Sequence, residues 1–428
     1  MAWQYDAQDL QLAFNGGAPV LENVPDHGRG AAFIDDAEIE AVSRVLRSRK
    51  LSRYESRESA VARFERKFAA AVDCPHALAC ASGTAAMRLA LAALAVRPGD
   101  EVLVPAIGSP AVADAVVAQG AVPVFVDVDE SFTMDPFDAE AKAGLGTRGL
   151  IAVHAFGIAS DVDQLLELAQ RNTLVIIEDA TQALGASYQG DMLGSRGYCS
   201  VFSFGAEGNI STGEGGALTF QDAINYERGV RYHDHGGAGS VRHGPAQMVG
   251  TRPAFWGENL RMSELQGAVL EVQVDKLPAV VEGMAAARRA LVAELKELGV
   301  EPVYDSPRAE FSQCVILKTK SQVARDLCVR ALRSEGVPAQ LLFGGKTTYD
   351  ADHVLGARTV NGTSQFGCSN CGIDLPGYTR GLCPTAEHLL SVCLSVPVGP
   401  KYSRDEVRAI AKGVSRVLGY ASRSVGAR

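Results

Sequence analysis

Apolar residues recur at helical spacing in several parts of the chain, each bordered by polar positions. Residues 35–49 begin with acidic side chains and continue with Ile39, Val42 and Val45, which predicts an amphipathic helix. We expect Lys276-Leu277-Pro278 to mark the end of another helix, because proline cannot continue the hydrogen-bond ladder. Further helices are predicted over residues 61–72, 85–95, 161–170, 262–274, 284–298, 322–335 and 403–418.

Short apolar runs alternate with these helices and predict strands. The run over residues 173–179 is so apolar that both of its faces should be buried, as in a parallel sheet. Residues 351–378 are rich in Gly, Asn, Thr and Ser, which is typical of a loop at the rim of an active site. Other strands are expected within residues 76–81, 99–105, 122–129, 149–157, 200–204 and 311–318.

Composition narrows the class of protein. The chain has 428 residues, of which 47% are hydrophobic and 21% charged, as in an ordinary globular protein with a large core. Its net charge of −9 argues against nucleic acid and anionic membranes as main partners. We find no apolar run of about 18 residues and no secretory signal, so no membrane span is expected and the predicted location is the cytoplasm.

Nine cysteines in a chain of this size do not suggest a disulfide framework. Cys368, Cys371 and Cys383 form the one cluster, a weak metal-site candidate that needs a fourth ligand. We considered Cys393, Cys314 and His353 for that fourth position. The simpler interpretation is reduced thiols near a loop, so no metal is predicted.

The tripeptide Ser82-Gly83-Thr84 lies between a predicted strand and a helix rich in Ala and Leu. Such a junction presents free backbone N–H groups and a hydroxyl at a helix N-terminus, an arrangement that binds phosphate. The same residues also make a good helix cap, so the tripeptide alone leaves both interpretations open.

The most informative stretch runs from Ser203 to Gly216 and reads Ser-Phe-Gly-Ala-Glu-Gly-Asn-Ile-Ser-Thr-Gly-Glu-Gly-Gly. It resembles the cofactor-binding segment of the DegT/StrS family of sugar aminotransferases, fold-type I enzymes that use pyridoxal 5′-phosphate (PLP). In the family pattern, Ser-Phe is followed by three variable residues, a lysine that binds PLP covalently, four more residues and Gly-Glu-Gly-Gly. Here both flanking motifs are in register, and Gly208 stands where the lysine should be.

The resemblance extends from about residue 33 to about residue 418. It includes Glu178-Asp179-x-x-Gln182 and Gly257-x-Asn259-x-Arg261-Met262. It implies an α/β fold of the fold-type I class, with a mostly parallel, seven-stranded-type sheet between helices and a smaller α+β C-terminal domain. The implied organisation is an N-terminal arm over residues 1–30, a large domain over 31–275 and a small domain over 276–428.

The resemblance also implies roles for single residues. Asp179 would face the pyridine nitrogen of the cofactor and keep it protonated, so that the ring can take up electrons. Gln182 would lie against the ring hydroxyl, and Ser203 would bind the phosphate together with Ser82-Gly83-Thr84. Asn259 would reach the phosphate in the neighbouring subunit, which implies a homodimer with shared active sites.

Two positions depart from the family pattern. Gly108-Ser109 replaces a threonine and an aromatic residue, which removes ring stacking worth roughly 0.5–1.5 kcal/mol. Gly208 can neither bind PLP covalently nor carry a proton, so ordinary amino transfer is not expected. Lys346 is the one lysine that we considered as a substitute.

Another group would then have to act as the base, and the sequence offers three candidates. His235 lies in a His-Gly segment that resembles one of the family, and His154 lies in a Val-His-x-x-Gly motif. Glu207 directly precedes Gly208. Each histidine is also well explained as a structural residue.

Three functions remain compatible with the sequence. In the first, an enzyme of secondary metabolism, such as antibiotic biosynthesis, acts on a sugar, cyclitol or similar polar ketone. It would hold pyridoxamine phosphate (PMP) or PLP without a covalent bond and would catalyse dehydration or another reaction that is not transamination. In the second, the enzyme uses no cofactor and binds its substrate in the former PLP pocket. In the third, the chain is a non-catalytic subunit that completes the site of an active relative.

Overall fold

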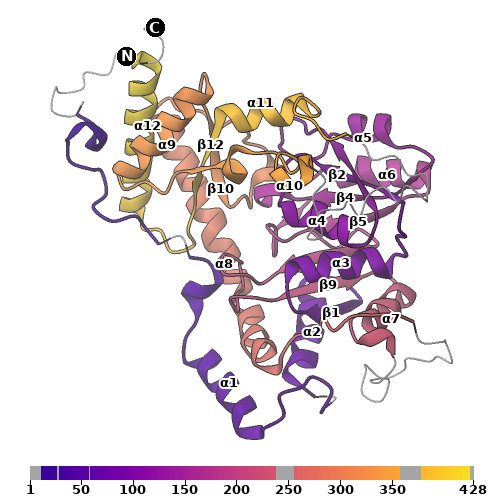
Figure 1. Ribbon diagram of the computed structural model, residues 1–428. Coiled ribbons are helices and arrows are strands. Elements are labelled where there is room, and N and C mark those ends of the chain that lie inside the picture. Colours follow the sequence, from indigo (N-terminus) through magenta and orange to yellow (C-terminus); the bar gives the residue numbers. More distant parts are fainter. Residues whose placement is uncertain (1–10, 27, 57, 238–254, 357–376, 425–428) are drawn as a thin grey trace.

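The computed structural model describes residues 11–26, 28–56, 58–237, 255–356 and 377–424. A large domain is built around a twisted sheet, and a smaller domain at the C-terminal side is joined to it by the long helix α8, Glu264–Glu297 (Figure 1). No helix in these ranges is both long enough and apolar enough to cross a membrane.

The main sheet of the described chain has seven strands in the order β1-β9-β8-β5-β4-β2-β3. The five strands from β8 to β3 are parallel, while β9 pairs antiparallel with both β1 and β8. The predicted α/β architecture with a mostly parallel sheet is therefore confirmed. The strands are β1 (His76–Cys80), β2 (Glu101–Pro105), β3 (Val122–Val126), β4 (Thr147–Val153), β5 (Val175–Asp179), β8 (Cys199–Ser203) and β9 (Gly216–Phe220). A short hairpin, β6 (Ser187–Tyr188) and β7 (Asp191–Met192), lies outside this sheet.

Helices cover both faces of the sheet, because successive side chains of each strand point to opposite faces. On β5, Ile177 packs with α3 (Gly83–Ala93), α4 (Pro110–Ala118) and α7 (Ala223–Tyr232). The neighbouring Ile176 faces the other way, toward α5 (Pro136–Lys142) and α6 (Val162–Asn172). Another part of this second face of the sheet packs against α2 (Ala60–Ala71) and α8. Helix α1 (Asp36–Ser48) packs on the outside of these two helices. Burial on both faces explains the uninterrupted apolar run that the sequence displays.

The small domain has its own apolar core. Its antiparallel sheet has the order β10-β12-β11 in the described residues. The core lies between this sheet, the second half of α8 and two further helices, α9 and α12. The elements are β10 (Cys314–Lys318), β11 (Gln340–Leu341), β12 (Cys393–Pro397), α9 (Gln322–Ser334), α10 (Asp352–Leu355), α11 (Pro384–Val392) and α12 (Arg404–Ser424).

The sequence prediction that a helix ends near Pro278 is wrong. Helix α8 continues through Pro278 without interruption. A proline inside a helix costs about 3 kcal/mol, since it removes one hydrogen bond and its ring crowds the preceding turn. Here Leu277, Val280 and Met284 are all buried, and burying each such side chain contributes about 1.5–3 kcal/mol. Tertiary packing therefore outweighs the local cost, and the expected domain boundary at 275/276 falls within one helix.

The N-terminal arm contacts the rest of the chain at two places. The carboxylate of Glu335, which is fully buried, accepts hydrogen bonds from the backbone amides of Ala13 and Val20 at 2.8 and 3.1 Å. Further along, Arg29 donates to the backbone carbonyl of Glu207 at 2.7 Å, and the amide of Gly30 donates to the carbonyl of Gly208 at 3.0 Å. The arm thus contacts the outside of the turn in which the family lysine is missing.

Candidate active site

A cavity of about 180 Å³ lies at the carboxyl edge of the parallel strands. Ligands bind at this edge in open α/β sheets. Strand β5 ends at Asp179 and β8 ends at Ser203, while α3 begins at Gly83. The chain thus brings together, from distant parts of the sequence, Ser82, Gly83, Thr84, Met87, Ser109, Ala111, Val112, Asp179, Thr181, Val201, Ser203 and Glu214.

One side of the cavity is formed by the start of α3. The hydroxyl of Ser82 caps this helix by accepting from the amide of Ala85 at 3.1 Å. Gly83 lies so close to Ser203 that an added Cβ would come within 2.9 Å of the Cβ of Ser203. No carbonyl within the helix can accept from the first amides of α3, and they carry a partial positive charge. Together with the hydroxyls of Thr84 and Ser203, they make a suitable cradle for a phosphate.

Asp179 supplies a buried carboxyl group to the same cavity. It is 3% exposed, and its Oδ1 accepts from the amide of Thr181 at 3.0 Å. Burial raises the pKa of Asp179, and the hydrogen bonds from Thr181 offset this only in part. A carboxylate in this environment is stabilised by a cationic partner such as a protonated ring nitrogen.

Ser109 stands at the position of the missing aromatic residue, and the preceding Gly108 has space around it. The hydroxyl of Ser109 caps α4 and accepts from the amide of Ala111 at 3.3 Å. At Gly108 the nearest atom to an added Cβ is the hydroxyl oxygen of Thr348, at 3.7 Å. The described residues that line the cavity include Ser109 and no aromatic residue, as the sequence indicates.

Gly208 is enclosed by carbonyl oxygens. A Cβ added there would lie 2.5 Å from the carbonyl oxygen of Ile210 and 3.2 and 3.3 Å from those of Gly205 and Ser203. The first of these distances is shorter than any tolerable contact. The turn over residues 205–210 would therefore have to shift its backbone to accept any side chain at this position, lysine included.

The backbone of His154 lies beside that of Asp179, but both nitrogens of its ring already have hydrogen-bond partners. Its Nδ1 accepts from the amide of Ser160 at 3.1 Å, so the ring proton resides on Nε2, which lies 3.0 Å from Oε2 of Glu178. Burial disfavours the charge on Glu178, yet the hydrogen bonds from His154 and two backbone amides outweigh it and lower the pKa of this carboxyl. His154 is also fully buried. These contacts are those of a structural residue, not of a base that faces the cavity.

The other two candidate bases do not line the cavity. His235 is exposed, with a positive φ of 53°, and lies in a turn held by the amide–carbonyl bond from His235 to Glu258. Glu207 is also exposed, and it is its backbone carbonyl that binds Arg29.

Two predicted cofactor ligands also lie outside the cavity lining. Gln182 is half-buried, and its Oε1 accepts from the amide of Phe156 at 2.7 Å. Asn259 is exposed, and its Oδ1 accepts from the amide of Arg261 at 3.4 Å.

The remaining candidates have ordinary positions. Lys346 is exposed and is not part of the cavity lining. Cys383 is fully buried, 4.0 Å from the amine of Lys142, and Cys368 and Cys371 lie outside the described residues. Among the residues that the structure does describe, no group of three or more His, Cys, Asp or Glu side chains could hold a metal ion.

Sequence reasoning missed two polar residues of the cavity. Thr181 and Glu214 both line it, although their motifs were recognised without assigning them a role. The signal was available, since Thr181 falls inside Asp179-x-x-Gln182 and Glu214 inside the Gly-Glu-Gly-Gly sequence. Only the folded chain shows that Asp179 and Glu214 are the titratable side chains of the lining.

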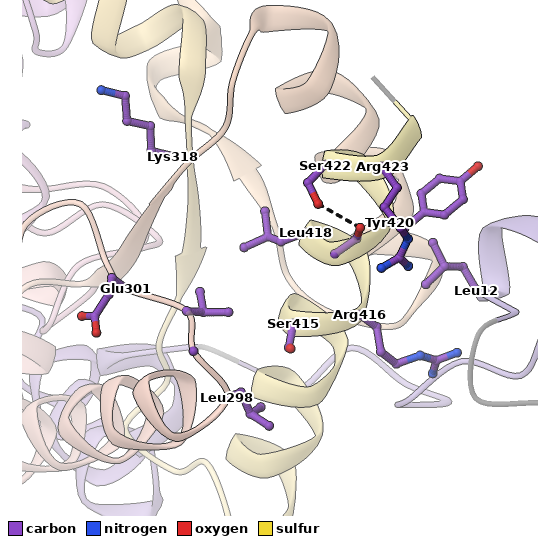
Figure 2. A pocket seen from close by; sticks show the side chains of 13 residues that line it. Leu12, Leu298, Glu301, Lys318, Ser415, Arg416, Leu418, Tyr420, Ser422 and Arg423 are labelled. Carbon is purple, nitrogen blue, oxygen red and sulfur yellow. Dashed lines mark hydrogen bonds between the residues drawn. The ribbon is translucent and has the colours of Figure 1, made fainter. Parts of the chain in front are cut away.

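A larger hollow lies elsewhere, on the small domain. It measures about 420 Å³ and lies beside the end of α8 and the C-terminal part of α12, with Leu12 of the arm at one side (Figure 2). Its charged lining residues are Glu301, Lys318, Arg416 and Arg423. It shares no residue with the cavity around Asp179.

The sequence model of the DegT/DnrJ/EryC1/StrS aminotransferase family matches residues 32–363. The chain belongs to this family. It is 31% identical over 354 residues to the UDP-N-acetyl-3-dehydro-α-D-glucosamine 3-aminotransferase of Acidithiobacillus ferrooxidans, covering 80% of this chain and 84% of that one. It is 34% identical over 320 residues to the L-glutamine:2-deoxy-scyllo-inosose aminotransferase of Streptomyces kanamyceticus, covering 70% and 71%.

Solved structures agree with this assignment. The crystal structure of 3-amino-5-hydroxybenzoic acid synthase matches with a TM-score of 0.78 and 26% identity, covering 94% of this chain and all of that one. DesI, solved in the presence of its TDP-sugar product, also matches with a TM-score of 0.78 and 26% identity, covering 98% and 99%. The fold-type I aminotransferase fold is thereby established for this member of the DegT/StrS family.

The family is one of PLP-dependent aminotransferases, and most of its cofactor contacts fit the cavity. Asp179 is a buried carboxyl with a raised pKa and a cation would stabilise it, while Ser82, Thr84 and Ser203 surround the start of α3. The residues present therefore suit a phosphorylated pyridine. What this member lacks is the side chain at position 208 for a covalent bond.

Proposed function

We propose that this protein is a divergent sugar or cyclitol enzyme of secondary metabolism that holds PMP or PLP non-covalently and does not carry out ordinary transamination. The observation that carries the proposal is the contrast within one cavity. The cradle at α3 and the carboxyl of Asp179 are in place, while position 208 carries no side chain and its turn would have to shift to accept one.

The chain's own residues can hold such a cofactor without a covalent bond. The start of α3 with Ser82, Thr84 and Ser203 would hold the phosphate, and Asp179 would hold the ring nitrogen as its cation. When bound, the cofactor supplies an electron sink for reactions at the substrate carbon attached to its amine. Thr181 would fix the orientation of Asp179 through the amide hydrogen bond to Oδ1.

A polar ketone is the substrate class that we favour. The relatives reported above act, by their names, on a dehydro-glucosamine and on a deoxy-inosose, which are both polyhydroxylated ketones. The hydroxyls of Ser109 and Thr181 add hydrogen-bonding groups where an aromatic ring is missing. The exposed Asn259 supports a homodimer in which each subunit contributes to the other's site.

The test is direct binding. PMP and PLP are titrated separately into the purified protein by isothermal calorimetry, with inorganic phosphate as a competitor. We expect saturable binding of one cofactor per chain, and competition by phosphate at millimolar concentration because of the cradle at α3. The absence of binding by both cofactors would reject the proposal and direct attention to a cofactor-independent enzyme.

A further inference from the structure

We infer that Glu214 makes the cavity select the amine form of the cofactor, PMP, over forms that are neutral at the same position. The inference rests on the proposed function, since it concerns the ligand of the same cavity. It assigns a specificity-determining role to a residue of the lining, not a catalytic one.

Glu214 is one of the residues that line the cavity, and hydrogen bonds hold its backbone in place. Its carbonyl oxygen accepts from the hydroxyl of Thr212 at 2.5 Å and from the side-chain amide of Gln266 at 2.7 Å. It lies between Gly213 and Gly215, whose φ angles of 79° and 157° form a tight turn before β9. Among the residues that the structure describes, the carboxylate of Glu214 makes no hydrogen bond or ion pair, so it is available to a ligand at the cavity.

The charges of the lining do not balance. Asp179 and Glu214 are both carboxyl groups, and the part of the lining that the structure describes includes no lysine, arginine or histidine. In a family member with the usual lysine, the ammonium group of that side chain supplies a positive charge, which Gly208 cannot provide. The positive N-terminal end of α3 is suited to binding the phosphate, so it does not replace the charge of the missing ammonium group.

PMP brings the missing charge with it. Its aminomethyl group is an ammonium ion at neutral pH, whereas the aldehyde of PLP and the hydroxymethyl group of pyridoxine 5′-phosphate are uncharged. A carboxylate attracts the ammonium group and has no comparable attraction to the neutral groups. Because Glu214 is exposed, the attraction is screened by water and salt, and a moderate preference is expected.

The experiment compares PMP with pyridoxine 5′-phosphate, which has nearly the same shape and cannot react with lysines. Kd values are measured by calorimetry for the unmodified protein, Glu214→Gln and the control Glu207→Gln. Glutamine keeps the size of the side chain and the backbone bonds of Glu214, and Glu207 is an exposed glutamate of the same segment outside the cavity. Thermal unfolding verifies that each variant is folded.

We expect the unmodified protein to prefer PMP, and Glu214→Gln to reduce the ratio of the two Kd values by about fivefold, the upper range for an exposed ion pair. Glu207→Gln should leave the ratio unchanged, and 0.5 M salt should diminish the preference only in proteins that retain Glu214. An unchanged ratio in Glu214→Gln, with both ligands still bound, would overturn the inference alone. Failure of both ligands to bind the unmodified protein would reject the proposed function as well.

Discussion

Gly208→Lys is expected to leave the protein unable to bind PLP covalently. A Cβ at this position meets the carbonyl oxygen of Ile210 at 2.5 Å, so the backbone must move before any longer side chain can reach the cavity. The arm resists that movement, because the amide of Gly30 binds the carbonyl of Gly208, and Gly30 lies so close that a Cβ added to it would meet the Cα of Ile210 at 2.5 Å. The variant should lose about 1–3 kcal/mol of unfolding free energy, as is typical when a close-packed site is overfilled.

Gly205→Ala provides the matched control in the same turn. A Cβ at Gly205 has only the hydroxyl oxygen of Ser203 nearby, at an ordinary 3.6 Å. In urea unfolding, Gly205→Ala should therefore be about as stable as the unmodified protein. Gly208→Ala and Gly208→Lys should both be less stable. If the introduced lysine forms a stoichiometric, borohydride-reducible bond with PLP in a protein of unchanged stability, the steric account of this turn is wrong.

Asp179→Asn is expected to change stability and binding in opposite directions. Burial raises the pKa of Asp179 above its usual 3.8, so the folded state holds the proton more tightly than the unfolded state does. The ionised carboxylate then destabilises the fold, and this penalty grows as the pH rises from about the unfolded pKa to the folded pKa. Asparagine cannot ionise, so the ligand-free variant should unfold about 1–3 °C higher at pH 7, and the difference should shrink as the pH approaches 4.

The same substitution should weaken PMP binding. A hydrogen bond from a charged group contributes about 1.5–3 kcal/mol, which corresponds to roughly 10–100-fold in Kd. Differential scanning fluorimetry between pH 4 and 8, together with calorimetric titration at pH 7, measures both effects. Thr84→Ser is a suitable comparison, because it keeps a hydroxyl at the start of α3 and leaves Asp179 unchanged. A less stable Asp179→Asn protein with unchanged PMP affinity would contradict the assigned partner of Asp179.

Much of the fold could be predicted because its signals are local. The apolar run ending at Asp179 predicts a strand buried on both faces, and β5 has Ile176 and Ile177 in separate cores. Ser82-Gly83-Thr84 was placed correctly at the start of a helix. The path of α8 through Pro278 could not be predicted, since it depends on packing against residues distant in sequence.

The candidate site was predictable only in part, for a similar reason. Motif positions identify Asp179 and Ser203, and both line the cavity. The sequence also shows that a lysine is missing at position 208, but not that three carbonyl oxygens surround this position. His154 and Glu207 do not line the cavity, since the ring of His154 is bound by Glu178 and Ser160, and Glu207 is exposed, while Glu214 is part of the lining.

The central claim is that the cavity retains its cofactor without a covalent bond. The most direct measurement is the intact mass of the protein after incubation with PLP and borohydride, combined with the amount of PMP that elutes with the protein in gel filtration. We predict about one PMP per chain and no stoichiometric covalent adduct. A single adduct per chain that maps to one lysine, for example Lys346, would contradict this account and show that another residue has replaced the lysine missing at position 208.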